Sequence, residues 1–156
     1  AVLDGGSMGA REGMLLGSML AGQAFANAPV AAVHALAYPL GGNYHIPHGL
    51  SNSLVLPAVL EFNMSEAYRL YAELADVFIP GSAIGSAESK ANAFLESMRE
   101  IIRDVDLPPT LEKVNIPEAD LEMLAAEAML QQRLLINNPR EVTEEAALNI
   151  YQAAYR

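Results

Sequence analysis

Hydrophobic and polar residues follow a helical period along most of this chain. The clearest case is the stretch from Ala91 to Val105, where apolar residues recur three and four positions apart and the charged residues fall on the opposite face. No stretch alternates with a period of two over a useful length, so the pattern gives no sign of a β-strand. The sequence therefore predicts an all-α fold, an irregular multi-helix bundle of about six to eight helices by ordinary helix lengths.

Proline, glycine and capping residues divide the chain into the expected helices. Their ranges are 8–28, 29–37, 48–62, 65–78, 91–105, about 117–128 and 143–154. Residues 39–43 contain one proline and two glycines, so they are expected to break the chain into a tight turn. Such a turn would fold the helix that carries His34 back against the helix that begins at His48.

A long segment, residues 13–60, contains no Asp, Glu, Lys or Arg. A run of this length without charge is expected to form the buried centre of the molecule. Its first part belongs to the helix at 8–28, which is apolar nearly all round, as core helices and membrane spans both are. The glycines of that helix, with Gln23, Asn27 and the following Pro29, favour the central helix of a bundle over a membrane span.

All three histidines of the chain, His34, His45 and His48, lie within the uncharged segment. His48 is expected at a helix N-terminus, where the macrodipole disfavours a positive charge and so favours the neutral imidazole that can bind a metal. Two histidines without a neighbouring carboxylate are a weak metal signal. From the residues alone, His34 and His48 are therefore either metal ligands or core histidines that are hydrogen-bonded to backbone carbonyls.

Composition narrows the class of protein. The chain has 156 residues, of which 52% are hydrophobic, enough for one domain with a good core. Its formal net charge of −10 argues against nucleic acid and against an anionic membrane surface as partners. There is no cysteine, so disulfides and thiolate metal sites are excluded. With no signal-peptide pattern either, the expected compartment is the cytoplasm.

The sequence lacks the residue patterns of several other catalytic and binding sites. A ferritin-like di-iron bundle needs Glu-x-x-His pairs, but Ala31, Gly42 and His45 stand three residues before the histidines. The His-Glu-x-x-His motif of zinc proteases is absent, and no serine or cysteine nucleophile has a recognisable base. The glycines of residues 5–9 lack the preceding strand and the following lysine of a phosphate-binding loop.

One motif in the chain is distinctive. It reads His34-(x3)-Tyr38-Pro39-(x8)-His48-Gly49, with Leu50-Ser51-Asn52 and Leu56-Pro57 after it. This run resembles the histidine-rich signature of the iron-containing, or group III, alcohol dehydrogenases. The similarity continues at residues 12–18, 24–28, 107–108, 138–140 and 150–151. It spans essentially the whole chain, which resembles only the C-terminal helical half of such an enzyme.

The resemblance implies a fold and a site. Residues 1–156 would be a single helical metal-binding domain, the C-terminal domain of a two-domain dehydrogenase, and the N-terminal nucleotide-binding domain would be absent from this chain. In the family one divalent metal is held by an aspartate and three histidines, and His34 and His48 match two of those histidines. The other two ligands would lie before residue 1. The resemblance favours Fe(II), with Zn(II) as the alternative.

The resemblance also implies the reaction. The family transfers a hydride between a small alcohol, aldehyde or ketone substrate and NAD(P), while the metal acts as a Lewis acid on the substrate oxygen. NAD(P) would be bound mainly by the missing N-terminal domain, so no residue of this chain is assigned to it. The chain alone would then be inactive and would supply half of the metal cage and one wall of the substrate pocket.

Tyr38 departs from several relatives, which carry a histidine at this position. It lies one helical turn after His34 and so on the same face. Tyr38 is therefore either a catalytic relay hydroxyl or an aromatic packing residue whose hydroxyl is hydrogen-bonded. His45 has no matched role and is expected in the pocket or in a loop.

An alternative from a different class is a non-catalytic helical module for assembly or partner binding. The sequence upstream of Ala1 would distinguish the two, because an α/β pattern with a glycine-rich loop and an Asp-x-x-x-His pair would favour the enzyme. The sequence leaves open whether the protein forms a homo-oligomer.

Overall fold

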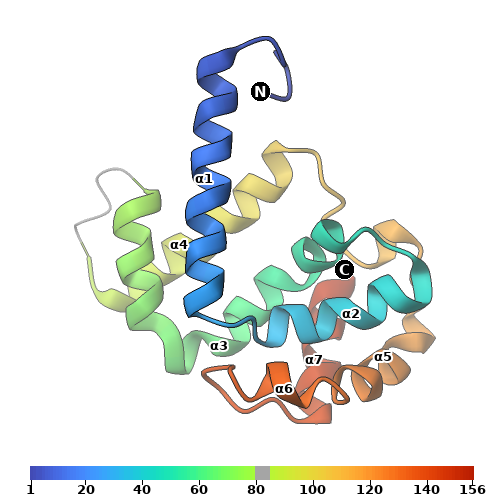
Figure 1. Cartoon of the computed structure of the whole chain (residues 1–156). Coiled ribbons are helices and arrows are strands. Elements are labelled where there is room, and N and C mark those ends of the chain that lie inside the picture. Colours follow the sequence, from blue (N-terminus) through green and yellow to red (C-terminus); the bar gives the residue numbers. More distant parts are fainter. Residues whose placement is uncertain (80–84) are drawn as a thin grey trace. The chain divides into compact units, whose positions relative to one another are not determined.

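The computed structural model describes residues 1–79 and 85–156, and over these ranges it is helical and contains no strand. The α-helices of the described ranges are α1 (Met8–Asn27), α2 (Ala32–Tyr44), α3 (His48–Phe78), α4 (Ala87–Asp104), α5 (Leu121–Ala128), α6 (Gln132–Leu135) and α7 (Glu144–Tyr155) (Figure 1). Two 3-10 helices, Glu112–Val114 and Glu118–Asp120, precede α5. The all-α prediction is confirmed. The chain forms two compact units, Ala1–Val30 and Ala31–Arg156.

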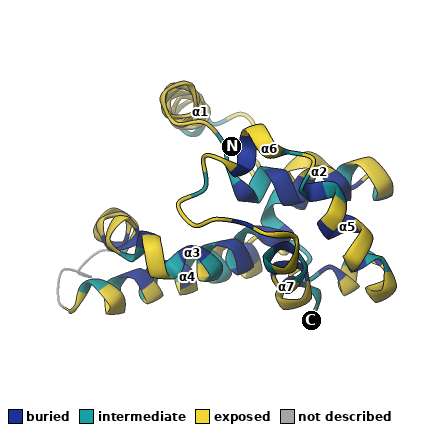
Figure 2. Cartoon of the chain, turned by 90° about the horizontal axis from the view of Figure 1, so that it is seen from below, coloured by how far each residue is buried: buried dark blue, intermediate teal, exposed yellow. Residues whose placement is uncertain are grey.

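The first unit consists of α1 and short flanking segments. Ser7 caps the helix, since its hydroxyl accepts a hydrogen bond from the Ala10 N–H at 3.4 Å. None of the 20 residues of α1 is buried, and Figure 2, in which the helix is seen end-on, colours its turns mostly as exposed. The predicted helix is confirmed, but the prediction that residues 13–60 form one buried centre is wrong for the part within α1. Ala1–Val30 contains no second helix that could cover it.

The core of the second unit lies around α2 and α7, which both pack against α3 and α5. The side chains that are almost completely buried come from all of these helices and from the segment before α5. Tyr151 on α7 is one of them, and its hydroxyl donates a hydrogen bond to the backbone carbonyl of Leu36 on α2 at 2.6 Å. The uncharged residues that follow α1 therefore form a core within α2 and α3, as predicted, but the prediction is wrong for the connection between these helices, where His45 and His48 are exposed.

Two predicted helix breaks are absent. The helix α2 continues through Pro39, Gly41 and Gly42, and α3 continues through the expected boundary before Ser65. Pro39 removes one backbone hydrogen bond and the glycines disfavour helix. Burial of the apolar face of α2 outweighs these local costs. Across the second boundary, buried residues on both sides keep α3 helical for 31 residues.

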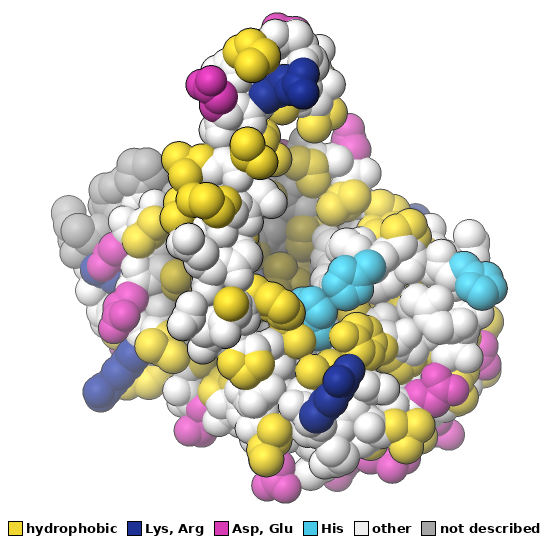
Figure 3. Space-filling view, viewed as in Figure 1, with side chains coloured by type: hydrophobic (Ala, Val, Ile, Leu, Met, Phe, Trp, Pro, Cys, Tyr) yellow, Lys and Arg dark blue, Asp and Glu magenta, His cyan; other side chains and the backbone are white. Residues whose placement is uncertain are grey.

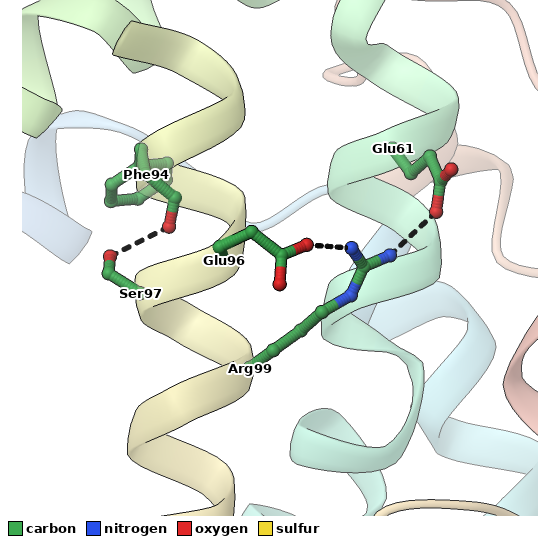
Figure 4. A network of polar contacts seen from close by, with 5 residues as sticks. All are labelled: Glu61, Phe94, Glu96, Ser97 and Arg99. Atoms are coloured by element: carbon green, nitrogen blue, oxygen red, sulfur yellow. Dashed lines mark hydrogen bonds and ion pairs between the residues drawn. The ribbon is translucent and has the colours of Figure 1, made fainter. Parts of the chain in front are cut away.

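The helices α3 and α4 pack side by side over a small apolar cluster. Its buried members are Ala67, Tyr71, Ala75, Ala91 and Phe94. Arg99 adds polar contacts at the edge, because its guanidinium donates to Glu61 of α3 at 2.8 Å and to Glu96 of α4 (Figure 4). Glu61 and Glu96 are more than half exposed, so these ion pairs contribute little to stability by themselves.

The segment before α7 is fixed to α3 by a pair of asparagines. Asn63 and Asn138 exchange side-chain hydrogen bonds of 3.0 and 2.8 Å. Arg140 donates to the Phe62 carbonyl at 2.8 Å and stacks over the Phe62 ring. Residues 138–140, one of the further ranges in which the sequence resemblance was found, thus have a structural role in this fold.

The C-terminal end of α2 is tied to the α5 region by two polar contacts. Tyr44 donates to Asp120 at 2.6 Å, and the Asn43 amide donates to Glu127 at 2.6 Å. Partial burial, followed by the hydrogen bond and the charge of Asp120, raises the pKa of Tyr44 from 10.0 to about 12. This contact holds the end of the helix that carries His34.

We expect the Tyr44 contact to weaken in alkaline solution. Because the folded-state pKa of Tyr44 is about 12 and its ordinary value is 10.0, the stabilisation is complete below pH 10 and is lost as the pH rises towards 12. A spectrophotometric tyrosinate titration should show a component near pH 12 that is missing in Tyr44→Phe. Tyr155→Phe is the control and should retain it. A Tyr44→Phe titration identical to that of the unaltered chain would contradict the assignment.

Candidate metal centre

The connection between α2 and α3 brings His34 and His48 together. The helix α2 ends at Tyr44. The next residue, His45, adopts a left-handed conformation with φ of 55° and donates its backbone N–H to the Gly41 carbonyl. After two further residues α3 begins at His48. The reversal therefore occurs at His45, and the prediction of a Gly41-Gly42 turn is wrong. His45 lies in the connecting loop; the sequence had predicted that it lies either in a loop or in the pocket.

Three aromatic side chains converge across this connection. The ring centroids of His34 and His48 are 5.1 Å apart, and those of Tyr38 and His48 are 6.4 Å apart. His34 and Tyr38 belong to one face of α2, while His48 is the first residue of α3. His34 is half-buried and the other two side chains are exposed. Figure 3 shows histidine side chains at the surface in two separate places.

The electrostatic environment favours a neutral His34. Burial, and secondly the neighbouring His48, lowers the pKa of the His34 imidazole below its ordinary value of 6.5. At neutral pH His34 therefore keeps a free lone pair, as a metal-binding imidazole requires.

The two imidazoles fit a metal only as part of a ligand set. No group of three or more His, Cys, Asp or Glu residues that could hold a metal occurs in residues 1–79 and 85–156. Two imidazole donors satisfy half of a four-coordinate shell, and a complete site needs ligands from elsewhere. Imidazole is a suitable ligand for both Fe(II) and Zn(II).

Two neighbours of the site were not predicted. Asn52 lies one turn after His48 on α3, and its side-chain nitrogen is 3.1 Å from His48 Nε2. Glu127 of α5 shares with Tyr38 and Leu130 the lining of an open cavity of about 370 Å³. Asn52 belongs to the quoted motif, so its i, i+4 spacing from His48 was a usable signal. No local pattern linked Glu127 to Tyr38, because only the tertiary packing of α5 on α2 brings them together.

Residues 1–155 match the sequence family described as "Fe-containing alcohol dehydrogenase family, C-terminal". The chain belongs to this family. Among curated proteins, it is 40% identical over 155 residues to "Long-chain-alcohol dehydrogenase 1" of Geobacillus thermodenitrificans. It is 36% identical over 153 residues to "Lactaldehyde reductase" of Escherichia coli K12. These matches cover 99% and 96% of this chain.

The solved structures agree with the family assignment. The chain superposes on a 1,3-propanediol oxidoreductase with a TM-score of 0.92 and 32% identity, over 99% of this chain and 40% of that one. It spans 39% of the length of both curated relatives. The resemblance to Fe-containing alcohol dehydrogenases, and to their C-terminal helical domain in particular, is therefore confirmed.

No helix among the described residues is both long enough and apolar enough to cross a membrane.

Proposed function

We propose that this chain is the C-terminal domain of a metal-dependent alcohol dehydrogenase that transfers a hydride between an alcohol and NAD(P). The convergence of His34, His48 and Tyr38 supports this proposal most directly. Their side chains come from two different helices of a chain whose family is shown. A helical module used only for assembly would not need two imidazoles beside each other at the surface. The dehydrogenase is therefore the function that we infer.

His34 and His48 would hold the divalent metal, which is Fe(II) by family and Zn(II) as the alternative. When bound, the metal supplies Lewis-acid polarisation of the substrate oxygen. His34 contributes a neutral donor, because its lowered pKa keeps the ring unprotonated at neutral pH. The remaining ligands would come from the part of the relatives' length that this chain does not cover.

Tyr38 would supply a hydroxyl beside the reacting oxygen. It is exposed next to His48, so a substrate can reach it, and a phenol can donate and accept a proton in one hydrogen-bond chain. The cavity between Tyr38, Leu130 and Glu127 would form one wall of the pocket for a small alcohol, aldehyde or ketone.

We place NAD(P) on the N-terminal nucleotide-binding domain of the full-length enzyme and the enzyme itself in the cytoplasm. The chain's acidic composition, with a net charge of −10, makes it a poor surface for the cofactor's phosphates. In this arrangement the helical chain presents the metal-side wall, and hydride transfer takes place between the two domains.

A reconstitution experiment tests the function. The purified full-length enzyme should reduce NAD(P) with primary alcohols, lose this activity on chelation, and regain it with Fe(II) or Zn(II) but not with Mg(II). Nicotinamide absorbance measures the rate. Activity that survives complete chelation, with metal absence verified by mass spectrometry, would exclude the proposed metal chemistry.

The variant Tyr38→Phe should show whether the Tyr38 hydroxyl takes part in proton transfer or whether the side chain only packs. Losing a proton-transfer group should reduce kcat on the order of 10²-fold and change the pH–rate profile, while KM and metal content stay close to their original values. Tyr68→Phe is the matched control, because this tyrosine of α3 packs against the apolar cluster between α3 and α4 and not beside the histidines. An unchanged rate and pH profile in Tyr38→Phe would leave Tyr38 with a packing role only.

A further inference from the structure

The hydroxyl group of Tyr151 reaches from α7 to the turn of α2 that carries the candidate metal centre. Tyr151 is completely buried, and its hydroxyl donates to the backbone carbonyl of Leu36 at 2.6 Å. Leu36 lies two residues after His34 and two before Tyr38. The bond therefore holds the backbone midway between the two side chains that α2 contributes to the centre.

The helix itself holds this turn of α2 only weakly. Pro39 has no N–H group, so the carbonyl of Ala35, four residues earlier, lacks its usual helix hydrogen bond. Among the residues that the structure describes, no side chain caps the N-terminus of α2 at Ala31 by a hydrogen bond. The polar contacts with the α5 region lie at the opposite end of the helix. The bond from Tyr151 thus fixes α2 where its own backbone bonds are incomplete.

The hydroxyl of Tyr151 is a lasting donor. Burial, and secondly the charge of Glu127, raises the pKa of this hydroxyl above its ordinary value of 10.0, so it keeps its proton at neutral pH. Its acceptor, the carbonyl of Leu36, belongs to a residue that is completely buried as well. A hydrogen bond in such an environment is stronger than one in water.

The helix α7 connects this bond to the other half of the centre. It packs against α3, and α3 begins with His48. Apolar packing has no preferred direction and tolerates small shifts of one helix along another. A hydrogen bond has a narrow range of length and angle. The bond from α7 therefore defines the position of α2 relative to α3 more sharply than apolar contact alone does.

We propose that Tyr151 is a positioning residue of the candidate metal centre. Through Leu36 it sets how α2 presents His34 to His48, whose ring centroids lie 5.1 Å apart. Binding groups of this kind must be held within about 0.5 Å of their productive geometry, so a small shift of α2 has a consequence. The effect of Tyr151 on metal binding rests on the proposed function; its effect on the position of α2 does not.

Proton NMR of this chain in metal-free buffer tests the geometry directly. The chain has three histidines to assign, and the ring protons of His34 and His48 should show a mutual nuclear Overhauser cross-peak. Tyr151→Phe keeps the ring and deletes the donor, so we expect it to lose this cross-peak. The matched control is Tyr71→Phe, which deletes the hydroxyl of a buried tyrosine in the cluster between α3 and α4 and should retain the cross-peak.

Four results would overturn the proposal. The cross-peak could be missing from the unaltered chain or unchanged in Tyr151→Phe. It could also be lost in both variants, which would show that buried hydroxyls stabilise the core in general. A Tyr151→Phe chain that is unfolded by circular dichroism would show that the bond is a requirement of the whole fold. Finally, 4-aminophenylalanine at position 151 can donate in place of the hydroxyl and should restore the cross-peak; failure to do so would show that the lost donor is not the cause.

Metal titration of the full-length enzyme tests the consequence. Tyr151→Phe should weaken Zn(II) affinity on the order of ten-fold, the lower end of the range for residues that orient a metal ligand, and Tyr71→Phe should leave it unchanged. Equal affinities in Tyr151→Phe and the unaltered enzyme would contradict a role in metal binding. If the unaltered enzyme takes up no metal while the NMR result holds, the proposed function fails and the positioning of α2 by Tyr151 stands.

Discussion

Replacing His34 or His48 by alanine in the full-length enzyme is expected to remove the bound metal and the dehydrogenase activity together. Each substitution deletes one of two imidazoles whose rings lie 5.1 Å apart. Changes to residues that merely orient a ligand cost about 10- to 100-fold in metal affinity or activity, so loss of a ligand should exceed about 100-fold. Metal content by mass spectrometry and the rate of NAD(P) reduction, measured on the same samples, check the result.

His45 offers the control for these substitutions. It is exposed in the loop between the two helices and adopts φ of 55°, which asparagine tolerates better than alanine does. His45→Asn should therefore keep both metal and activity. If His34→Ala retains stoichiometric metal while His45→Asn loses it, our assignment of the ligands is incorrect.

Residues 1–156 on their own are expected to have no dehydrogenase activity and to bind a divalent metal only weakly. A complete four-ligand structural zinc site supplies roughly 10–16 kcal/mol. Half of that, from two neutral imidazoles, corresponds to dissociation constants from roughly micromolar to hundreds of micromolar. Without a carboxylate ligand the site also lacks the negative charge that offsets the charge of the metal. Calorimetric titration with Zn(II) or Fe(II), and an assay with alcohol and NAD(P), check both statements.

A matched variant makes the titration decisive. The weak binding that remains should disappear in the double variant His34→Ala/His48→Ala and persist in His45→Asn. Tight one-to-one binding by the isolated chain, abolished in the double variant, would mean that residues 1–156 carry a complete site. The ligands would then have to include residues that we have not assigned.

Much of the helical structure could be predicted from local patterns. The apolar spacing between Ala91 and Val105 predicted α4, and Thr143 with the acidic residues after it predicted the start of α7, where the threonine hydroxyl caps the helix at 3.1 Å. These signals work because caps and amphipathic faces act over one or two turns. The breaks expected near Pro39 and Ser65 were wrong, because burial on both sides of each position outweighs the local preference.

The sequence by itself determined that this protein is helical, to which family it belongs, and which residues could bind a metal, because periodicity, motif spacing and donor chemistry are properties of the chain. Only the tertiary structure decided that His45 makes the reversal, that His34 and Tyr38 meet His48, and that the Asn52 amide faces the ring of His48. It also decided that α1 leaves its apolar side chains exposed. Contacts of these kinds depend on the packing of whole helices, which no local pattern of residues specifies.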